Sequence, residues 1–278
     1  MLSLKSIFIY IVLNSILLFI SSLHYIIISS IKLNILKCIW YVLKNLIFVK
    51  IIDLLVKYIK NKSKYITKNT SNISNTSNTI IYLLSYSIIE TITYYIITHN
   101  TFFGSFDLLV KYNIYMILKN FIMFIPISFI FDIIFDFFHY WTHRICHANS
   151  YLYKNIHKHH HSNVNVTPIV AFVQHPIDIM FTNILPLGLT LVIMKNMNIQ
   201  FNLFILSCIL TYKTYLEVVG HADIKSNRTS SFPQFIWITR ILHIQLFNKH
   251  HIIHHKRNKN FSKRFSLWDK IFGTFQNK

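Results

Sequence analysis

Several apolar runs in this sequence are long enough to cross a lipid bilayer, and they constrain the fold more than any other feature. A helix needs about 20 apolar residues to cross roughly 30 Å of hydrocarbon. Hydrophobic residues make up 53% of the 278 residues and charged residues only 13%, which is too apolar for an ordinary soluble domain. Runs of sufficient length lie at 7–28, 79–98, 112–138 and 177–219, the last as two runs joined near 195–198. The sequence therefore predicts an all-α fold, a polytopic integral membrane helical bundle.

The N-terminal part of the chain allows more than one interpretation. The run at 7–28 exceeds the apolar core of a signal peptide and lacks a clear cleavage site, which favours an uncleaved first span. Residues 31–59 are apolar but carry Lys37, Lys44, Lys50 and Asp53, so they form either a short second span or a helix in the membrane interface. We expect an N-terminal membrane region at 1–60, a polar low-complexity linker at 61–79, and one membrane domain at 80–278.

The chain is strongly basic, with a formal net charge of +19. In a soluble protein this charge would suggest nucleic acid as the partner. Here the basic residues flank apolar spans or lie near the C-terminus, where the positive-inside rule and anionic headgroups explain them, and no nucleic-acid partner is expected. Basic segments at 57–68, 144–158 and 249–264 would then face the cytosol together. Cys38, Cys146 and Cys208 show neither metal spacing nor a disulfide framework.

Histidines are concentrated in one part of the sequence, where fourteen of the sixteen lie between His139 and His255. An H-x-x-x-H pair, His139 and His143, ends the apolar run at 112–138, and His147 continues the same helix face. Two H-x-x-H-H clusters follow. The first consists of His157, His160 and His161, and the second of His251, His254 and His255. His175 and His221 stand alone between the clusters, whereas His24, His99, His159, His243 and His250 are set aside as satisfied or solvent-facing.

The number of clustered histidines predicts two metal ions. Neutral imidazole binds iron, zinc, copper and nickel, and one ion takes three or four protein ligands. The pair and the two clusters together supply eight. An H-E-x-x-H motif is absent from the sequence, so a zinc protease of that type is not supported. Asp136 lies three residues before His139 and Glu217 four before His221, so each carboxylate either orients a ligand imidazole or pairs with a nearby Lys or Arg.

These motifs together resemble the fatty acid hydroxylase / sterol desaturase superfamily. The matching segments are D-F-F-H-Y-W-T-H-R-I-C-H at 136–147, Y-K-N-I-H-K-H-H-H at 153–161, H-P-I-D at 175–178, H-I-I-H-H at 251–255 and F-S-L-W-D-K-I-F-G-T at 265–274. The resemblance covers about half of the chain, from roughly residue 132 to 275. His159 and the N-F-S segment at 260–262 depart from the usual pattern but remove no ligand.

The resemblance implies a catalytic membrane domain at 80–278 with a cytosol-facing, histidine-rich cap that holds two iron ions, for which zinc can substitute in purified samples. It implies an oxidoreductase that hydroxylates or desaturates a sterol, fatty acyl or sphingoid lipid in lipid biosynthesis. Such an enzyme uses O2 and electrons from NAD(P)H through cytochrome b5, typically in the endoplasmic reticulum. The implied ligands, carried over by motif position, are His139, His143, His157, His160, His161, His251, His254 and His255, joined by His175 and His221, with His147 as a further candidate.

Two other functions are compatible with the same residues. The first is a non-catalytic membrane protein with a structural or vestigial dimetal site. The second is a metal transporter, in which the ligands should line several spans at mid-membrane. The histidines instead cluster at span ends and in polar segments, which favours the enzyme.

Overall fold

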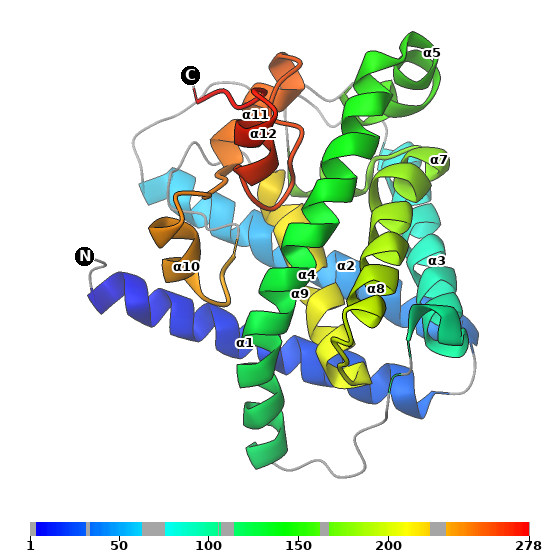
Figure 1. Ribbon diagram of the computed structural model, residues 1–278, viewed down its shortest axis with the longest axis vertical. Coiled ribbons are helices and arrows are strands. Elements are labelled where there is room, and N and C mark those ends of the chain that lie inside the picture. The colour runs from blue at the N-terminus through cyan, green and yellow to red at the C-terminus, as the bar shows by residue number, and fades with distance from the viewer. Residues whose placement is uncertain are drawn as a thin grey trace.

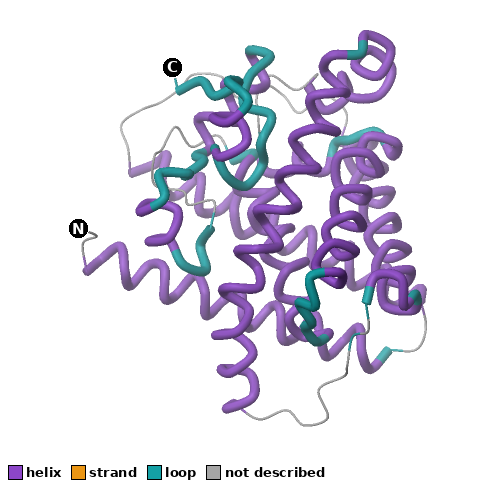
Figure 2. The backbone as a smooth tube through the Cα atoms, viewed as in Figure 1, coloured by secondary structure: helices purple, strands orange, loops and turns teal. Residues whose placement is uncertain are grey.

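The protein is all-helical over the residues that the structure, a computed structural model, describes: 4–31, 34–62, 76–104, 106, 114–161, 167–222 and 232–277. Helices joined by loops make up this part of the chain, with no strand among the described residues (Figure 2). The long helices are α1 (Leu4–Ser30), α2 (Asn34–Lys62), α3 (Thr76–His99), α4 (Ile114–Ala148), α8 (Leu185–Asn196) and α9 (Leu203–Gly220). The short ones are η1 (Thr101–Phe103), α5 (Ser150–Leu152), η2 (Tyr153–His157), α6 (Lys158–His161), η3 (Pro168–Phe172), α7 (Pro176–Ile179), η4 (Met180–Ile184), α10 (Ile236–Ile241), α11 (Asn248–Lys256) and α12 (Leu267–Ile271).

Among the described residues, five helical stretches are long and apolar enough to cross a membrane. They are Ile7–Ser30, Thr79–His99, Ile114–Ala148, Pro176–Asn196 and Leu203–Gly220. Each coincides with a run predicted from the sequence, and the prediction of an all-α bundle with membrane spans is confirmed. α2 is a continuous helix over the run whose role the sequence left open. The predicted linker falls largely on residues 63–75, which lie outside the described residues.

α9 forms the centre of the bundle. It is the most enclosed of the five spans, since 83% of the residues in its apolar stretch are buried. The reason is that α1, α2 and α4 all pack against it. α3 packs on α2, and α8 packs on α4 (Figure 1). The outward faces of the peripheral helices carry exposed apolar side chains such as Phe8, Phe19 and Ile122, as expected for surfaces that face hydrocarbon.

Residues 257–277, which include α12, pack on the upper half of α4 (Figure 1). Together with α5, η2, α6 and α11 they form a cap at one end of the bundle. The loop at 257–266, here called the clasp loop, is attached to α4 by the buried carboxylate of Asp136. This carboxylate accepts hydrogen bonds from the backbone amides of Lys263, Arg264 and Phe265 at 2.6, 2.9 and 2.9 Å. Within the motif W-D-x-x-F-G-T, Trp268 Nε1 donates to the carbonyl of Ile133 at 3.1 Å. The ending of the matched motif thus fixes the cap on the bundle.

Candidate metal centre

Nine histidines converge in two groups inside the cap. Within each group, one ring nitrogen of every member lies within 4.8 Å of those of the others. The first group consists of His143, His147, His157, His161 and His254, and the second of His160, His221, His251 and His255. Five and four imidazoles are enough for two metal ions.

Each H-x-x-H-H cluster contributes to both groups. On a helix, residues four apart share a face, so His157 and His161 enter the first group together while His160 points to the second. In α11 the division is reversed, because His251 and His255 enter the second group and His254 the first. Rings of the two groups lie close together, with the His161 and His255 centroids 4.6 Å apart. The two groups therefore adjoin each other and could together hold a pair of metal ions.

The outward ring nitrogens fix the tautomers of several members. His143 Nδ1 donates to the carbonyl of Phe261 at 2.9 Å, and His254 Nδ1 to that of Lys259 at 2.9 Å. His221 Nδ1 donates to the carbonyl of Glu217 at 2.8 Å. An imidazole that donates through Nδ1 carries its lone pair on Nε2, so these rings present acceptors toward the centre of their group.

The Nε2 atoms that point into each group lie at hydrogen-bonding distance from one another, which is unfavourable when neither atom carries a proton. His143 and His157 face each other at 3.1 Å, and Nδ1 of each is bonded elsewhere, to the carbonyl of Phe261 and to Asp178. In the second group the Nε2 atoms of His251 and His221 lie equally close, at 3.0 Å. Two lone pairs cannot hydrogen-bond with each other, whereas a shared cation satisfies both. Nitrogens about 2.1 Å from one ion and at right angles to each other would be about 3.0 Å apart. The residues present therefore fit a pair of metal ions.

Burial keeps these rings in the neutral form that binds metal. Desolvation, followed by the proximity of the other histidines, lowers the pKa of His254 to about 3 and that of His255 to about 2. The same causes lower the pKa of His160 and His251. Because these four imidazoles are neutral at physiological pH, a metal ion need not displace protons from them to bind.

Residues 128–274 of this chain match the model of the fatty acid hydroxylase family. The match covers just over half of the 278 residues and includes all nine histidines of the two groups. The chain belongs to the fatty acid hydroxylase family.

Several curated proteins of known name are similar to this chain over about half of its length. A fatty acid hydroxylase of Lecanicillium sp is 26% identical over 52% of this chain and 40% of its own length. Sphinganine C4-monooxygenase 1 of Arabidopsis thaliana is 27% identical over 51% of each chain. A C-4 methylsterol oxidase of Schizosaccharomyces pombe is 31% identical over 51% of this chain and 44% of its own. The matches thus span about half or less of these relatives, and no solved structure matches.

Two predicted ligands of this family member lie outside both groups. His139 donates through Nδ1 to the carbonyl of Thr182 at 2.6 Å, and it borders the first group without entering it. His175 is the N-cap of α7, where its Nδ1 accepts from the amide of Ile177 at 3.2 Å. His147, the further candidate, lies within the first group. The histidines set aside from the sequence also remain outside both groups.

The two carboxylates predicted to orient ligands do not contact imidazoles. Asp136 is occupied by the clasp-loop amides. Glu217 accepts the His221 Nδ1–H through its backbone carbonyl, while its carboxylate pairs with Lys263. Glu217 therefore forms the Lys pair that the sequence allowed, whereas Asp136 binds backbone amides, which is neither of the two alternatives.

Asp178 is the carboxylate that contacts an imidazole of the first group. Its carboxylate oxygens lie 2.9 and 3.0 Å from His157 Nδ1, and both side chains are buried. The motif H-P-I-D contained this residue, but the 21 positions that separate it from His157 gave no indication of contact.

Two basic residues at the end of the C-terminal basic segment point inward. The side chain of Lys263 is only 15% exposed and pairs with Glu217, and that of Arg264 is 2% exposed and lies 3.7 Å from Asp132. The segment at 249–264 as a whole stays predicted to face the cytosol, but these two side chains turn inward within it, because buried carboxylates on α9 and α4 bind them.

Proposed function

We propose that this protein is a membrane-bound di-iron oxidoreductase that hydroxylates or desaturates a lipid with O2. The observation that carries the proposal is the arrangement of nine imidazoles in two adjoining groups, with ring nitrogens converging at 3.0–3.1 Å, at the end of an apolar bundle. Bound iron would supply the redox chemistry for attack on an unactivated C–H bond. The relatives named as hydroxylase, monooxygenase and oxidase support the same class of reaction.

The protein would contribute the metal ligands and the shape of the site. His143, His147, His157, His161 and His254 would hold one ion, and His160, His221, His251 and His255 the other. A cavity of about 30 Å³ borders both groups, since His143 and His160 line it together with Glu217 and Lys263. A substrate carbon held there would lie beside both histidine groups, where bound iron would supply the redox chemistry.

The charge of the cap supports a proposal for the side of the membrane that the cap faces and for the protein that supplies its electrons. Lys256, Arg257 and Lys259 are exposed at the end of α11, beside the histidine groups. By the positive-inside rule this end would face the cytosol, from the endoplasmic reticulum membrane in a eukaryotic cell. The same surface would attract an acidic donor such as cytochrome b5, reduced by NAD(P)H. Charge reversal at Lys256 and Lys259 should then slow reduction by cytochrome b5 without changing the metal content.

Metal content and turnover together test the proposal. Detergent-purified protein should contain about two irons per chain and consume O2 with lipid extract as substrate. His254→Ala should lose iron from the first group and all turnover. His175→Asn is the matched control, because it removes an imidazole outside both groups and retains a side-chain acceptor for the α7 cap. Unchanged turnover after loss of metal from His254→Ala would instead indicate a structural dimetal site.

A further inference from the structure

We propose that a small cavity between α2, α3 and α9 binds one monovalent anion, either the carboxylate of a lipid or a free ion such as chloride, at a site separate from the histidine groups. The feature that carries this inference is Lys213, a lysine inside the bundle that no carboxylate neutralises. The inference is independent of the proposed oxidase function and is tested without turnover.

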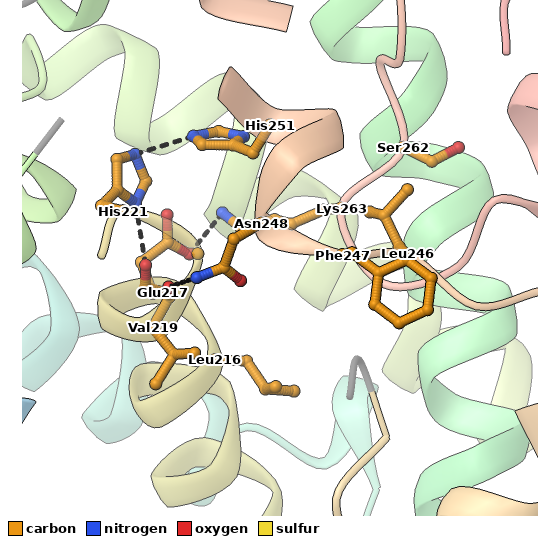
Figure 3. A pocket seen from close by; sticks show the side chains of 11 residues that line it. Leu216, Glu217, Val219, His221, Leu246, Phe247, Asn248, His251, Ser262 and Lys263 are labelled. Atoms are coloured by element: carbon orange, nitrogen blue, oxygen red, sulfur yellow. Dashed lines mark hydrogen bonds and ion pairs between the residues drawn. The ribbon is translucent and has the colours of Figure 1, made fainter. Parts of the chain in front are cut away.

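The other basic side chains inside the bundle each have an acidic partner. The pairs are Lys44–Glu90 at 3.8 Å, Lys263–Glu217, which a dashed line joins in Figure 3, and Arg264–Asp132 at 3.7 Å. Lys213, near the middle of α9, is only 8% exposed, and it forms neither a hydrogen bond nor an ion pair with any described residue. A charge inside a membrane span is costly unless it is paired. Lys213 therefore indicates a partner that the described residues do not supply.

Lys213 forms part of the wall of a cavity of about 20 Å³. Most of the other wall residues are apolar or aromatic, and they come from α2, α3, α7, η4, α8 and α9. Tyr41 belongs to this wall as well, and its buried hydroxyl has no hydrogen-bond partner among the described residues. None of the nine clustered histidines borders the cavity. An unpaired lysine and a tyrosine with an unpaired hydroxyl thus border one space away from the metal ligands.

The charge and size of the site select a small monovalent anion. Glu90 also borders the cavity, but its Oε2 accepts a hydrogen bond from Asn45 Nδ2 at 2.9 Å and lies 3.8 Å from Lys44 Nζ. Lys44, Glu90 and Lys213 together carry one net positive charge, which one negative charge balances. A space of about 20 Å³ holds one small group. A phosphate headgroup is therefore excluded by its size as well as by its charge.

An anion in this cavity would connect the N-terminal helices to the part of the chain that matches the family model. Tyr41 in α2 and Glu90 in α3 precede the matched residues 128–274, whereas Lys213 lies within them. A bound anion would neutralise Lys213 and hold α2 and α3 on α9. Because a ligand that binds only the folded state stabilises it, occupancy should raise the unfolding temperature of the intact protein.

Ligand binding and thermal unfolding of the zinc-loaded full chain, in nanodiscs of uncharged lipid, test this site. The probes are stearate, its neutral analogue octadecan-1-ol, and chloride exchanged for gluconate at constant ionic strength. If the anion is a lipid carboxylate, the intact protein should bind stearate at least about tenfold more tightly than the alcohol, as expected for the loss of a charged hydrogen bond. If it is a free ion, the protein should unfold at a higher temperature in chloride than in gluconate. Absence of both effects would overturn the proposal without any variant.

Lys213→Met removes the charge and keeps a long side chain. This variant should lose whichever effect the intact protein shows, and Lys213→Gln should lose it too if the methionine does not pack. Lys119→Met is the matched control, because Lys119 is exposed on α4 and does not border the cavity, and it should behave as the intact protein. Unchanged zinc content in each variant shows that the fold is retained. Persistence of the effect in folded Lys213→Met or Lys213→Gln, or an equal loss in Lys119→Met, would place the anion elsewhere and overturn the proposal.

Discussion

Both carboxylate oxygens of Asp178 lie within 3.0 Å of Nδ1 of His157. The two residues belong to different elements, α7 and η2, and both side chains are almost completely buried. A carboxylate in this position holds the proton on Nδ1, so that Nε2 faces the first group as a lone pair, and it makes the imidazole a stronger ligand. It also connects the first histidine group to the membrane bundle.

Asp178→Asn should weaken metal binding at the first group by about 10–100-fold, because the charge that supports His157 is lost while the shape is retained. Chelator competition on the purified protein measures this as two separate affinities. The second group, whose members do not contact Asp178, provides the internal reference. Equal weakening at both groups would mean that Asp178 acts through the fold rather than through His157.

His139 and His147 make a second comparison, since each lies four residues from His143 on the same helix. His147→Gln should lose iron from the first group, whereas His139→Gln should retain about two irons per chain. The reason is that His147 Nε2 lies 3.0 Å from His157 Nε2, while His139 donates to the carbonyl of Thr182 and lies outside both groups. Measuring the iron content of the two purified variants decides which of the two histidines is a metal ligand. Loss of iron from His139→Gln would show that His139 is a ligand.

This pair of residues also shows what the sequence could predict. Apolar length alone located the spans, and even the turn between α8 and α9 was expected, because Lys195 and Asn198 interrupt the apolar pattern. Spacing on a helix identified which histidines share a face. It could not choose between His139 and His147, which are both four residues from His143.

The remaining features depend on contacts between distant segments. Which ion His254 or His160 would serve depends on how α11 and α6 face each other across the centre. Asp178 meets His157, and Lys263 meets Glu217, only because α7, α9 and the clasp loop converge. Local patterns carry no information about such pairings, so the sequence identified Lys263 only as part of the basic segment at 249–264.

Acidification should destabilise the metal-free protein. His254 and His255 have pKa values of about 3 and 2 when folded, against about 6.5 when unfolded. Above pH 6.5 both states are neutral and these groups contribute nothing. As the pH falls below 6.5 only the unfolded state takes up protons, so stability is lost at up to about 1.4 kcal/mol per pH unit for each histidine.

Denaturant unfolding in detergent between pH 7 and pH 5 measures this effect. Protein treated with chelator should lose stability across this interval, whereas iron-loaded protein should be less sensitive until the metal is released, because metal binding holds the imidazoles neutral. A metal-free protein with the same stability at pH 7 and pH 5 would contradict this account.

Removing the Asp136 carboxylate should lower the stability of the fold directly and weaken metal binding only indirectly. In Asp136→Ala the amides of Lys263, Arg264 and Phe265 lose their acceptor, and a buried unsatisfied donor costs about 1–3 kcal/mol. A total loss of about 3 kcal/mol or more is expected, measured as a lower unfolding midpoint. The clasp loop also supplies the carbonyls of Phe261 and Lys259 that hold His143 and His254. Metal at the first group should therefore bind more weakly, and metal at the second group should be less affected.

Asp53→Asn is the control for this change. Asp53 is 37% exposed and pairs with Lys57 at 2.8 Å one turn along α2, an interaction worth only about 0.3–0.5 kcal/mol. Its loss should leave both the unfolding midpoint and the metal content nearly unchanged. If Asp136→Ala unfolds at the same midpoint as this control, the three short bonds to the clasp loop do not hold the cap on α4. The order of the two effects also has a physical basis, because Asp136 contacts backbone amides and can reach the metal ligands only through the loop that it fixes.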